Sequence, residues 1–126
     1  MRYKVNKKYY AELIRDDFRI YTIKRFYPEF NLQWFLENAD ETELTLIRTM
    51  GGEVIERTGK RPKENDDVIM VDEDDYAYYL RTTLKLEIIR EKHPEFNEEW
   101  IKENAKEKDC YWMYNATDEE LIEHVN

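Results

Sequence analysis

Residues 28–39 read PEFNLQWFLENA and residues 94–105 read PEFNEEWIKENA, so one unusual string occurs twice, 66 positions apart. The match continues without gaps over residues 10–39 and 76–105, where twelve of thirty positions are identical. Most apolar positions outside the string keep their apolar character in the other copy. Self-similarity at a fixed spacing indicates an internal duplication of one structural unit.

Each copy predicts three helices. The first spans about 8–26 and again about 74–92, and a proline soon afterwards ends it. Asn31 and Asn97 are suitable N-caps for a short second helix that carries a tryptophan. Asp40 and Thr117 each precede a glutamate by three residues, which is the capping-box spacing for a third helix. The expected apolar faces of the first helices are Tyr10, Ile14, Phe18 and Tyr21 in copy one, and Tyr76, Leu80, Leu84 and Ile88 in copy two.

We therefore predict a mainly α protein in which residues 1–126 form a single domain. Its two tandem three-helix repeats, about 8–51 and 74–126, are expected to share one core with pseudo-twofold symmetry. Four aromatic residues should approach the shared interior because they flank the predicted caps. They are Phe30, Trp34, Phe96 and Trp100.

The linker between the copies, about 52–73, breaks the helical pattern. Residues 53–56 and 68–71 have the composition of two short strands, and glycine and proline lie between them. We expect a short β-hairpin here. The alternative is that residues 53–57 continue the third helix and only residues 68–71 are extended.

The second copy contains about ten extra residues, Lys106–Asn115, which read KEKDCYWMYN. Tyr111, Trp112 and Tyr114 belong to the residue types that anchor protein interfaces. Two interpretations stay open for this insertion: it is a partner-binding element, or it covers a gap in the core of the second half.

Charge and composition restrict the functional classes. The net charge of −9 disfavours general binding to nucleic acid or to an anionic membrane, because both depend on an excess of Lys and Arg. No run of about 18 apolar residues spans a membrane, and the N-terminus lacks the apolar stretch of a signal peptide. Cys110 is the only cysteine, so an intrachain disulfide is impossible. We expect a cytoplasmic protein.

Catalytic and metal-binding patterns are missing from the sequence. The chain contains no serine, and no recognisable motif surrounds Cys110, His93 or His124. Residues 72–75 are acidic but lack the spacing of a calcium loop. The acidic residues and histidine of 119–124 have no counterpart in copy one that would complete a metal site. We expect no enzyme activity, no metal and no cofactor.

Our leading hypothesis is a non-enzymatic, acidic protein-binding module whose partner has a basic surface. Small, acidic and without serine, the chain is similar in type to phage and mobile-element inhibitors, the anti-CRISPR and antirestriction proteins. That resemblance implies that carboxylates block the nucleic-acid channel of a partner complex. The expected partner-binding residues are Asp72, Asp74, Asp75, Glu98, Glu99, Glu103 and Glu107, together with Tyr111, Trp112 and Tyr114.

Two other functional classes are compatible with parts of the sequence. A cytosolic structural or regulatory adaptor would self-associate, with the more basic first copy docking on the acidic second copy, so the protein is expected to be a monomer or a homodimer. Direct nucleic-acid binding would use Arg57, Lys60, Arg61 and Lys63 with the basic N-terminus. The surplus of acidic residues opposes that third class.

Overall fold

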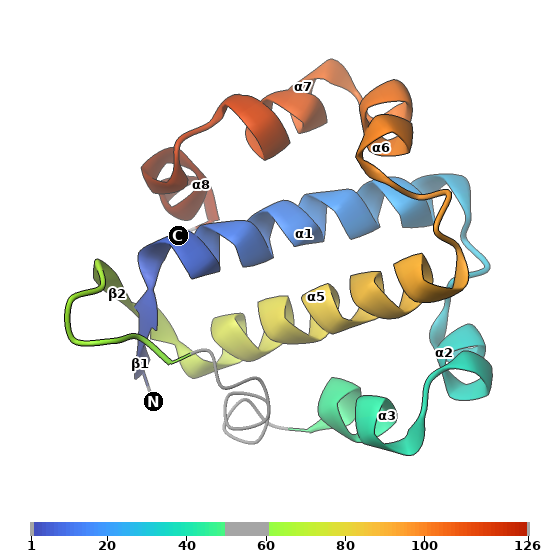
Figure 1. Ribbon diagram of the computed structural model, residues 1–126, viewed down its shortest axis with the longest axis horizontal. Helices are drawn as coiled ribbons and strands as arrows, with labels where there is room; N and C mark the ends of the chain where they lie inside the picture. The colour runs from blue at the N-terminus through green and yellow to red at the C-terminus, as the bar shows by residue number, and fades with distance from the viewer. Residues whose placement is uncertain (1, 50–60, 126) are drawn as a thin grey trace.

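The computed structural model describes residues 2–49 and 61–125, and this part of the chain is mainly helical with a small antiparallel sheet (Figure 1). The prediction of a mainly α protein is confirmed at this level. No helix in the two described ranges has both the length and the apolarity that crossing a membrane requires. The elements are β1 (Arg2–Asn6), α1 (Lys7–Phe26), α2 (Leu32–Asn38), α3 (Glu41–Arg48), β2 (Val68–Asp72), α5 (Glu73–Lys92), α6 (Glu98–Asn104), α7 (Glu107–Cys110), the π-helical turn η1 (Tyr111–Asn115) and α8 (Asp118–Val125).

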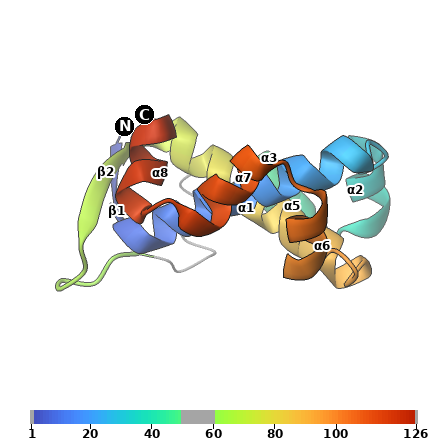
Figure 2. The ribbon, with the colours of Figure 1, turned by 90° about the horizontal axis from the view of Figure 1, so that it is seen from above.

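The two long helices, α1 and α5, lie side by side and run in the same direction (Figure 1). The short helices cross over between the halves. The segment α6–α8, which follows α5 in sequence, covers the outer side of α1, whereas α3, from the first half, packs against α5. Figure 2 shows α7 and α8 running above α1 in the perpendicular view. The two halves are therefore interlocked.

Helix boundaries follow from local capping chemistry. Asn6 and Asp72 cap the long helices, and each side chain accepts a hydrogen bond from a backbone N–H of the first turn. Asn31 and Asn97 cap α2 and α6 in the same way, through Trp34 N and Trp100 N. At the start of α3, Asp40 and Glu43 form both hydrogen bonds of the predicted capping box.

The small sheet of the described residues joins β2 to a strand at the N-terminal side of α1. Residues 68–72 are extended, as expected, but β2 pairs with the N-terminal strand β1, with Lys4 opposite Met70 at the centre of the register. The strand at Arg2–Asn6 was not predicted from the sequence. Residues 53–56, the other predicted strand, lie outside the described part. The pairing places the N-terminus beside the start of α5 and closes this end of the molecule.

The buried residues form two clusters, and each draws on both halves of the chain. One cluster lies near the sheet, and it contains Tyr10 and Tyr76 with Leu121 of α8. The other lies near the ends of the long helices, and it contains Phe30 and Phe96. Half-buried Phe18 packs against both.

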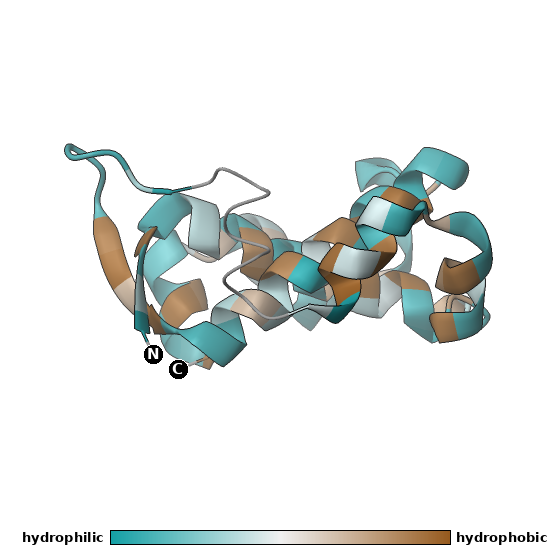
Figure 3. Ribbon diagram, turned by 90° about the horizontal axis from the view of Figure 1, so that it is seen from below, coloured by the Kyte–Doolittle hydropathy of each residue, from teal (hydrophilic) through white to brown (hydrophobic). Residues whose placement is uncertain are grey.

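The predicted apolar face of α1 is wrong in one respect: the side chain of Tyr21 is 58% exposed. Leu13, Ile20 and Ile23, on other sides of the helix, are buried instead. The reason is that α1 is covered on two sides, by α5 and by α6–α8, so it needs two apolar stripes rather than one. Figure 3 shows the result, with hydrophobic and hydrophilic residues mixed along the helices while β2 is mostly hydrophobic.

The repeated aromatic residues pack against each other at the end of the molecule opposite the sheet. The Phe30 and Phe96 rings meet edge-to-face with 5.7 Å between their centroids, and both side chains are buried. The ring centroids of Trp34 and Trp100 lie 4.9 Å from those of Phe30 and Phe96, respectively. Both tryptophans are half-buried at the edge of this group. Edge-to-face pairs are favourable because the positive ring edge meets a negative ring face.

We predict that Phe30→Ala and Phe96→Ala each lower the free energy of unfolding by about 3–5 kcal/mol, because each removes a buried ring and leaves a cavity. Since the two rings touch, the double variant should differ from the sum by at least about 0.5 kcal/mol. Urea unfolding measures both values. Leu32→Ala is the control, because Leu32 is 61% exposed and its truncation should cost little. Strict additivity would contradict the direct contact.

Candidate partner-binding site

The structure separates the predicted acidic residues into two groups. Asp72, Asp74 and Asp75 lie at the start of α5, beside the sheet, whereas Glu98, Glu99 and Glu103 lie on α6, beyond its other end. Most of α5, a helix of 20 residues and about 30 Å in length, separates the groups. The predicted phosphate-mimicking set is therefore divided between the two ends of α5. Asp72 has a structural role as well, because its side chain accepts a hydrogen bond from Asp74 N at the helix start.

Glu98 is also engaged within the protein. Its carboxylate lies 3.2 Å from Nε of Arg19 and 3.4 Å from Nη2 of Arg90, and it accepts a hydrogen bond from the hydroxyl of Tyr114. Partial burial raises its pKa, but the Tyr114 hydrogen bond and the two arginines outweigh this effect and hold the pKa below the ordinary value. Glu98 therefore joins α6 to α1, α5 and η1.

Arg19 is the centre of this network. Its guanidinium is buried, and Nη1 lies 2.7 Å from carboxylate oxygens of both Glu12 and Asp16. Asp16 also accepts a hydrogen bond from Thr83 of α5. Burial raises the pKa of Asp16 although Arg19 and Thr83 favour its ionised form. A buried guanidinium needs such partners, because desolvation of an unpaired charge costs several kcal/mol.

We predict that Glu98→Gln lowers the free energy of unfolding at pH 7 by about 1 kcal/mol, since the pair is partly exposed and solvent screens it. The lowered pKa means that ionised Glu98 stabilises the fold above the ordinary value of 4.5, and that this contribution is lost as the pH falls through the folded-state pKa. The stability difference between parent and variant should therefore shrink below pH 4.5, as measured by urea unfolding across pH. The matched control is Glu99→Gln on the same helix. An unchanged difference at low pH would show that the charge of Glu98 is irrelevant.

Among the predicted carboxylates of α6 and α7, three remain available to a partner. Glu99, Glu103 and Glu107 are exposed, and none forms an ion pair with a described residue. Glu99 and Glu103 are four residues apart on α6 and so lie on one face of that helix. Tyr111, which is 47% exposed, lies four residues after Glu107. We call Glu99, Glu103 and Glu107 the α6–α7 carboxylates.

The insertion Lys106–Asn115 forms α7 and the π-helical turn η1. The turn closes through the backbone hydrogen bond from Ala116 N to Tyr111 O, five residues back, at 3.0 Å. Arg15 of α1 holds it in place by donating to the carbonyls of Met113 and Ala116 and to the carboxylate of Asp118. Single π turns are rare and recur at functional sites in proteins.

The side chains of the insertion divide between the core and the surface. Met113 is fully buried in the cluster around Phe30, so this residue does cover the core. Trp112 is half-buried and stacks on His124 with 4.3 Å between the ring centroids. Tyr114 reaches Glu98, whereas Tyr111 is exposed. Only part of the predicted aromatic set is therefore accessible to a partner.

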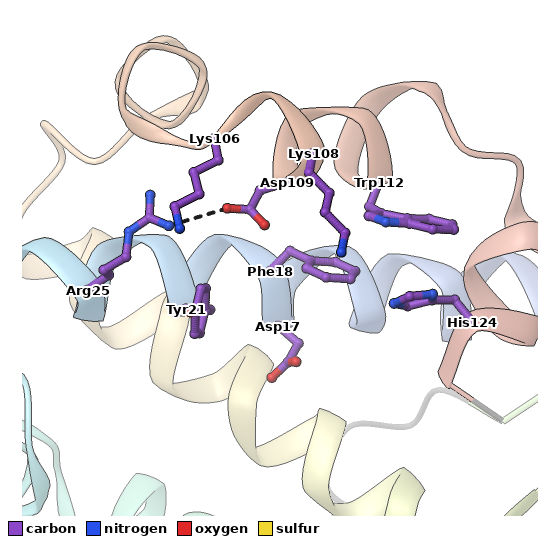
Figure 4. Close-up of a pocket in the computed structure, with 9 residues that line it drawn as sticks. All are labelled: Asp17, Phe18, Tyr21, Arg25, Lys106, Lys108, Asp109, Trp112 and His124. Atoms are coloured by element: carbon purple, nitrogen blue, oxygen red, sulfur yellow. Dashed lines mark ion pairs between the residues drawn. The ribbon is translucent and has the colours of Figure 1, made fainter.

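A hollow of about 390 Å³ lies between α1 and the insertion (Figure 4). Lys106 and Lys108 extend into it from α7, and the rings of Phe18 and Trp112 lie toward one end. Arg25 and Asp109 form an ion pair of 3.5 Å at the other end. The lining residues are Asp17, Phe18, Tyr21, Arg25, Lys106, Lys108, Asp109, Trp112 and His124.

A second, smaller hollow of about 190 Å³ lies between α1 and α5 and shares Asp17 and Tyr21 with the first. Lys24 and Lys85 line it, and burial together with their mutual repulsion lowers the pKa of Lys24. Tyr78 and Thr82 hydrogen bond with the carboxylate of Asp17, whose pKa is nevertheless raised by burial. The exposed ring of Tyr21 therefore stands between two hollows.

The sequence analysis missed this surface. Tyr21 falls on the predicted apolar face, and in the insertion only the aromatic residues, and not Lys106 and Lys108, are of the types that anchor interfaces. One signal was available: position 87, which matches position 21 in the other copy, is a glutamate. An aromatic residue in one copy and a charged residue in the other indicate a position that the core does not require.

The possible metal ligands and the cysteine and histidine side chains are dispersed over the two described ranges. They contain no group of three or more His, Cys, Asp or Glu side chains placed to hold a metal ion. The Cys110 sulfur lies near the carbonyl oxygens of Lys102 and Ala105. His93 pairs with Glu95, and His124 stacks on Trp112.

Comparison with known proteins gave no match to a family model, to a curated protein or to a solved structure.

Proposed function

We propose that this chain is a non-enzymatic protein-binding module, built on a duplicated scaffold, whose recognition surfaces lie where the second copy departs from the first. The observation that carries the proposal is the insertion, which encloses a hollow against α1 and continues the row of unpaired carboxylates on α6.

The duplication is supported by contacts between equivalent residues. The bounds of β1, α1 and α2 recur after 66 residues as those of β2, α5 and α6. In a twofold arrangement, only residues close to the axis can touch their own counterparts. Three pairs do so: Lys4 with Met70 in the sheet, Tyr10 with Tyr76, and Phe30 with Phe96. They lie along the seam between α1 and α5, which is the expected position of a pseudo-twofold axis.

The departures from this symmetry are concentrated in the second copy. Leu32 and Gln33 of α2 correspond to Glu98 and Glu99 of α6, and the insertion has no counterpart after α2. A residue that is identical in both copies mainly reflects the requirements of the fold, because both copies need the fold. An acidic or aromatic residue found in one copy alone, and not engaged within the protein as Glu98 is, can serve recognition.

The proposed partner is a protein with a basic surface. The α6–α7 carboxylates are exposed and unpaired within the described part, so their charge is available to Lys and Arg of another protein. A nucleic-acid-binding complex fits this requirement, and the protein then acts as an inhibitor of the anti-CRISPR or antirestriction type. In this proposal the protein works in the cytoplasm, where Cys110 stays reduced, and it needs no cofactor.

The proposal is tested with tagged protein expressed in its own cell. The parent should capture one protein, and Glu99→Gln/Glu103→Gln/Glu107→Gln should lose it. The matched control, Glu29→Gln/Glu37→Gln/Glu41→Gln, makes the same change in net charge on exposed residues of the first half and should retain it. Binding to the purified partner should weaken sharply as salt rises, and DNA or RNA should compete with it.

Equal capture by both triple variants would contradict a role for the α6–α7 carboxylates. A captured partner that binds independently of salt would contradict electrostatic docking.

A self-associating adaptor is the alternative. Analytical ultracentrifugation separates the two functions, because an adaptor should form dimers that dissociate at high salt, whereas the proposed binding module should remain a monomer until its partner is added.

A further inference from the structure

We propose that the hollow between α1 and the insertion binds an acidic peptide segment that carries an aromatic residue next to its carboxylates. This site is separate from the α6–α7 carboxylates. Its proposed ligand is acidic, whereas the partner proposed for those carboxylates has a basic surface. The inference goes beyond the proposed function and does not depend on docking to a basic surface.

One end of the hollow suits an aromatic side chain. Phe18 and Trp112 line this end, with His124 against Trp112, whereas the 58% exposed ring of Tyr21 lies nearer the Arg25 end of the hollow. An aromatic residue of a ligand gains edge-to-face contacts there and buries apolar surface that is otherwise in contact with water. Such residues are the usual anchors of protein interfaces.

The charged residues of the hollow leave an excess of positive charge. Of the two acids, Asp109 pairs with Arg25, and Asp17 hydrogen bonds with Tyr78 and Thr82. Lys106 and Lys108 are exposed and form no ion pair with any residue in 2–49 or 61–125. Both extend into the hollow in Figure 4. Two unpaired ammonium groups beside an aromatic end favour a ligand with one or two carboxylates next to a ring.

The size of the hollow favours a short segment. A volume of about 390 Å³ is near the lower end of the range for ligand sites, roughly 300–1,000 Å³, and accommodates a few side chains. A nucleic-acid strand would need many more phosphate contacts, and the net charge of −9 repels a long polyanion. A peptide with one aromatic residue and two acids matches both the volume and the number of free lysines.

The test uses the whole protein and three capped peptides: Gly-Phe-Asp-Glu-Gly, the neutral Gly-Phe-Asn-Gln-Gly, and Gly-Ala-Asp-Glu-Gly, which lacks the ring. Binding is followed by amide chemical shifts in two-dimensional NMR. The first peptide should shift the amides of residues 17–25 and 106–112, and both others should bind about fivefold more weakly or not at all. An oligothymidine of similar charge should not compete.

Two variants assign the effect to the hollow. Lys106→Gln/Lys108→Gln should weaken the first peptide about fivefold, whereas Lys63→Gln/Lys92→Gln, on exposed lysines elsewhere, should not. Tyr21→Ala should also weaken binding, with Leu32→Ala as its exposed control.

Three outcomes would overturn the proposal: equal binding of the neutral peptide, shifts confined to other residues, or no binding of the first peptide at millimolar concentration. The triple glutamine variant of the α6–α7 carboxylates should keep peptide binding, so failure here and failure of the proposed function are distinguishable.

Discussion

The structure depends on the side-by-side packing of two parallel helices, each of which is apolar on more than one side. Contacts along their seam, from Tyr10 with Tyr76 to the Phe30–Phe96 pair, bury only one side of each helix. The outer sides still carry large hydrophobic residues that water must not reach. The short helices provide that cover: α6–α8 on α1, and α3 on α5. The crossing of the halves follows from this need.

The same constraint explains why a hollow lies beside α1. On that side the cover is extended by the insertion, which Arg15 ties to α1 and Met113 anchors in the core. The insertion is attached to α1 and to the core at only a few points, so space remains between those points. The hollow lined by Tyr21 and Trp112 occupies that space. In the proposed function, stability and recognition use different side chains of this one short segment.

Charge is divided between structural and surface roles in a comparable way. Glu98 and Asp72 belong to the fold, the first through Arg19 and the second as a helix cap. Glu99 and Glu103, on the same helix as Glu98, have no such duty within the described residues. Among the many acidic residues of the chain, Glu99, Glu103 and Glu107 are exposed and unpaired within the described part, and two lysines, Lys106 and Lys108, line the hollow beside α1.

The sequence alone determined what local chemistry controls: the long helices, the asparagine caps at Asn31 and Asn97, the capping box at Asp40, and the repeated aromatic string. Those features depend on residues a few positions apart. Only the tertiary structure decided that β2 pairs with Arg2–Asn6, that the halves cross, that Tyr21 is exposed and that Glu98 is engaged. These outcomes depend on which distant surfaces meet, and hydrophobic periodicity is the same whichever neighbour covers a helix.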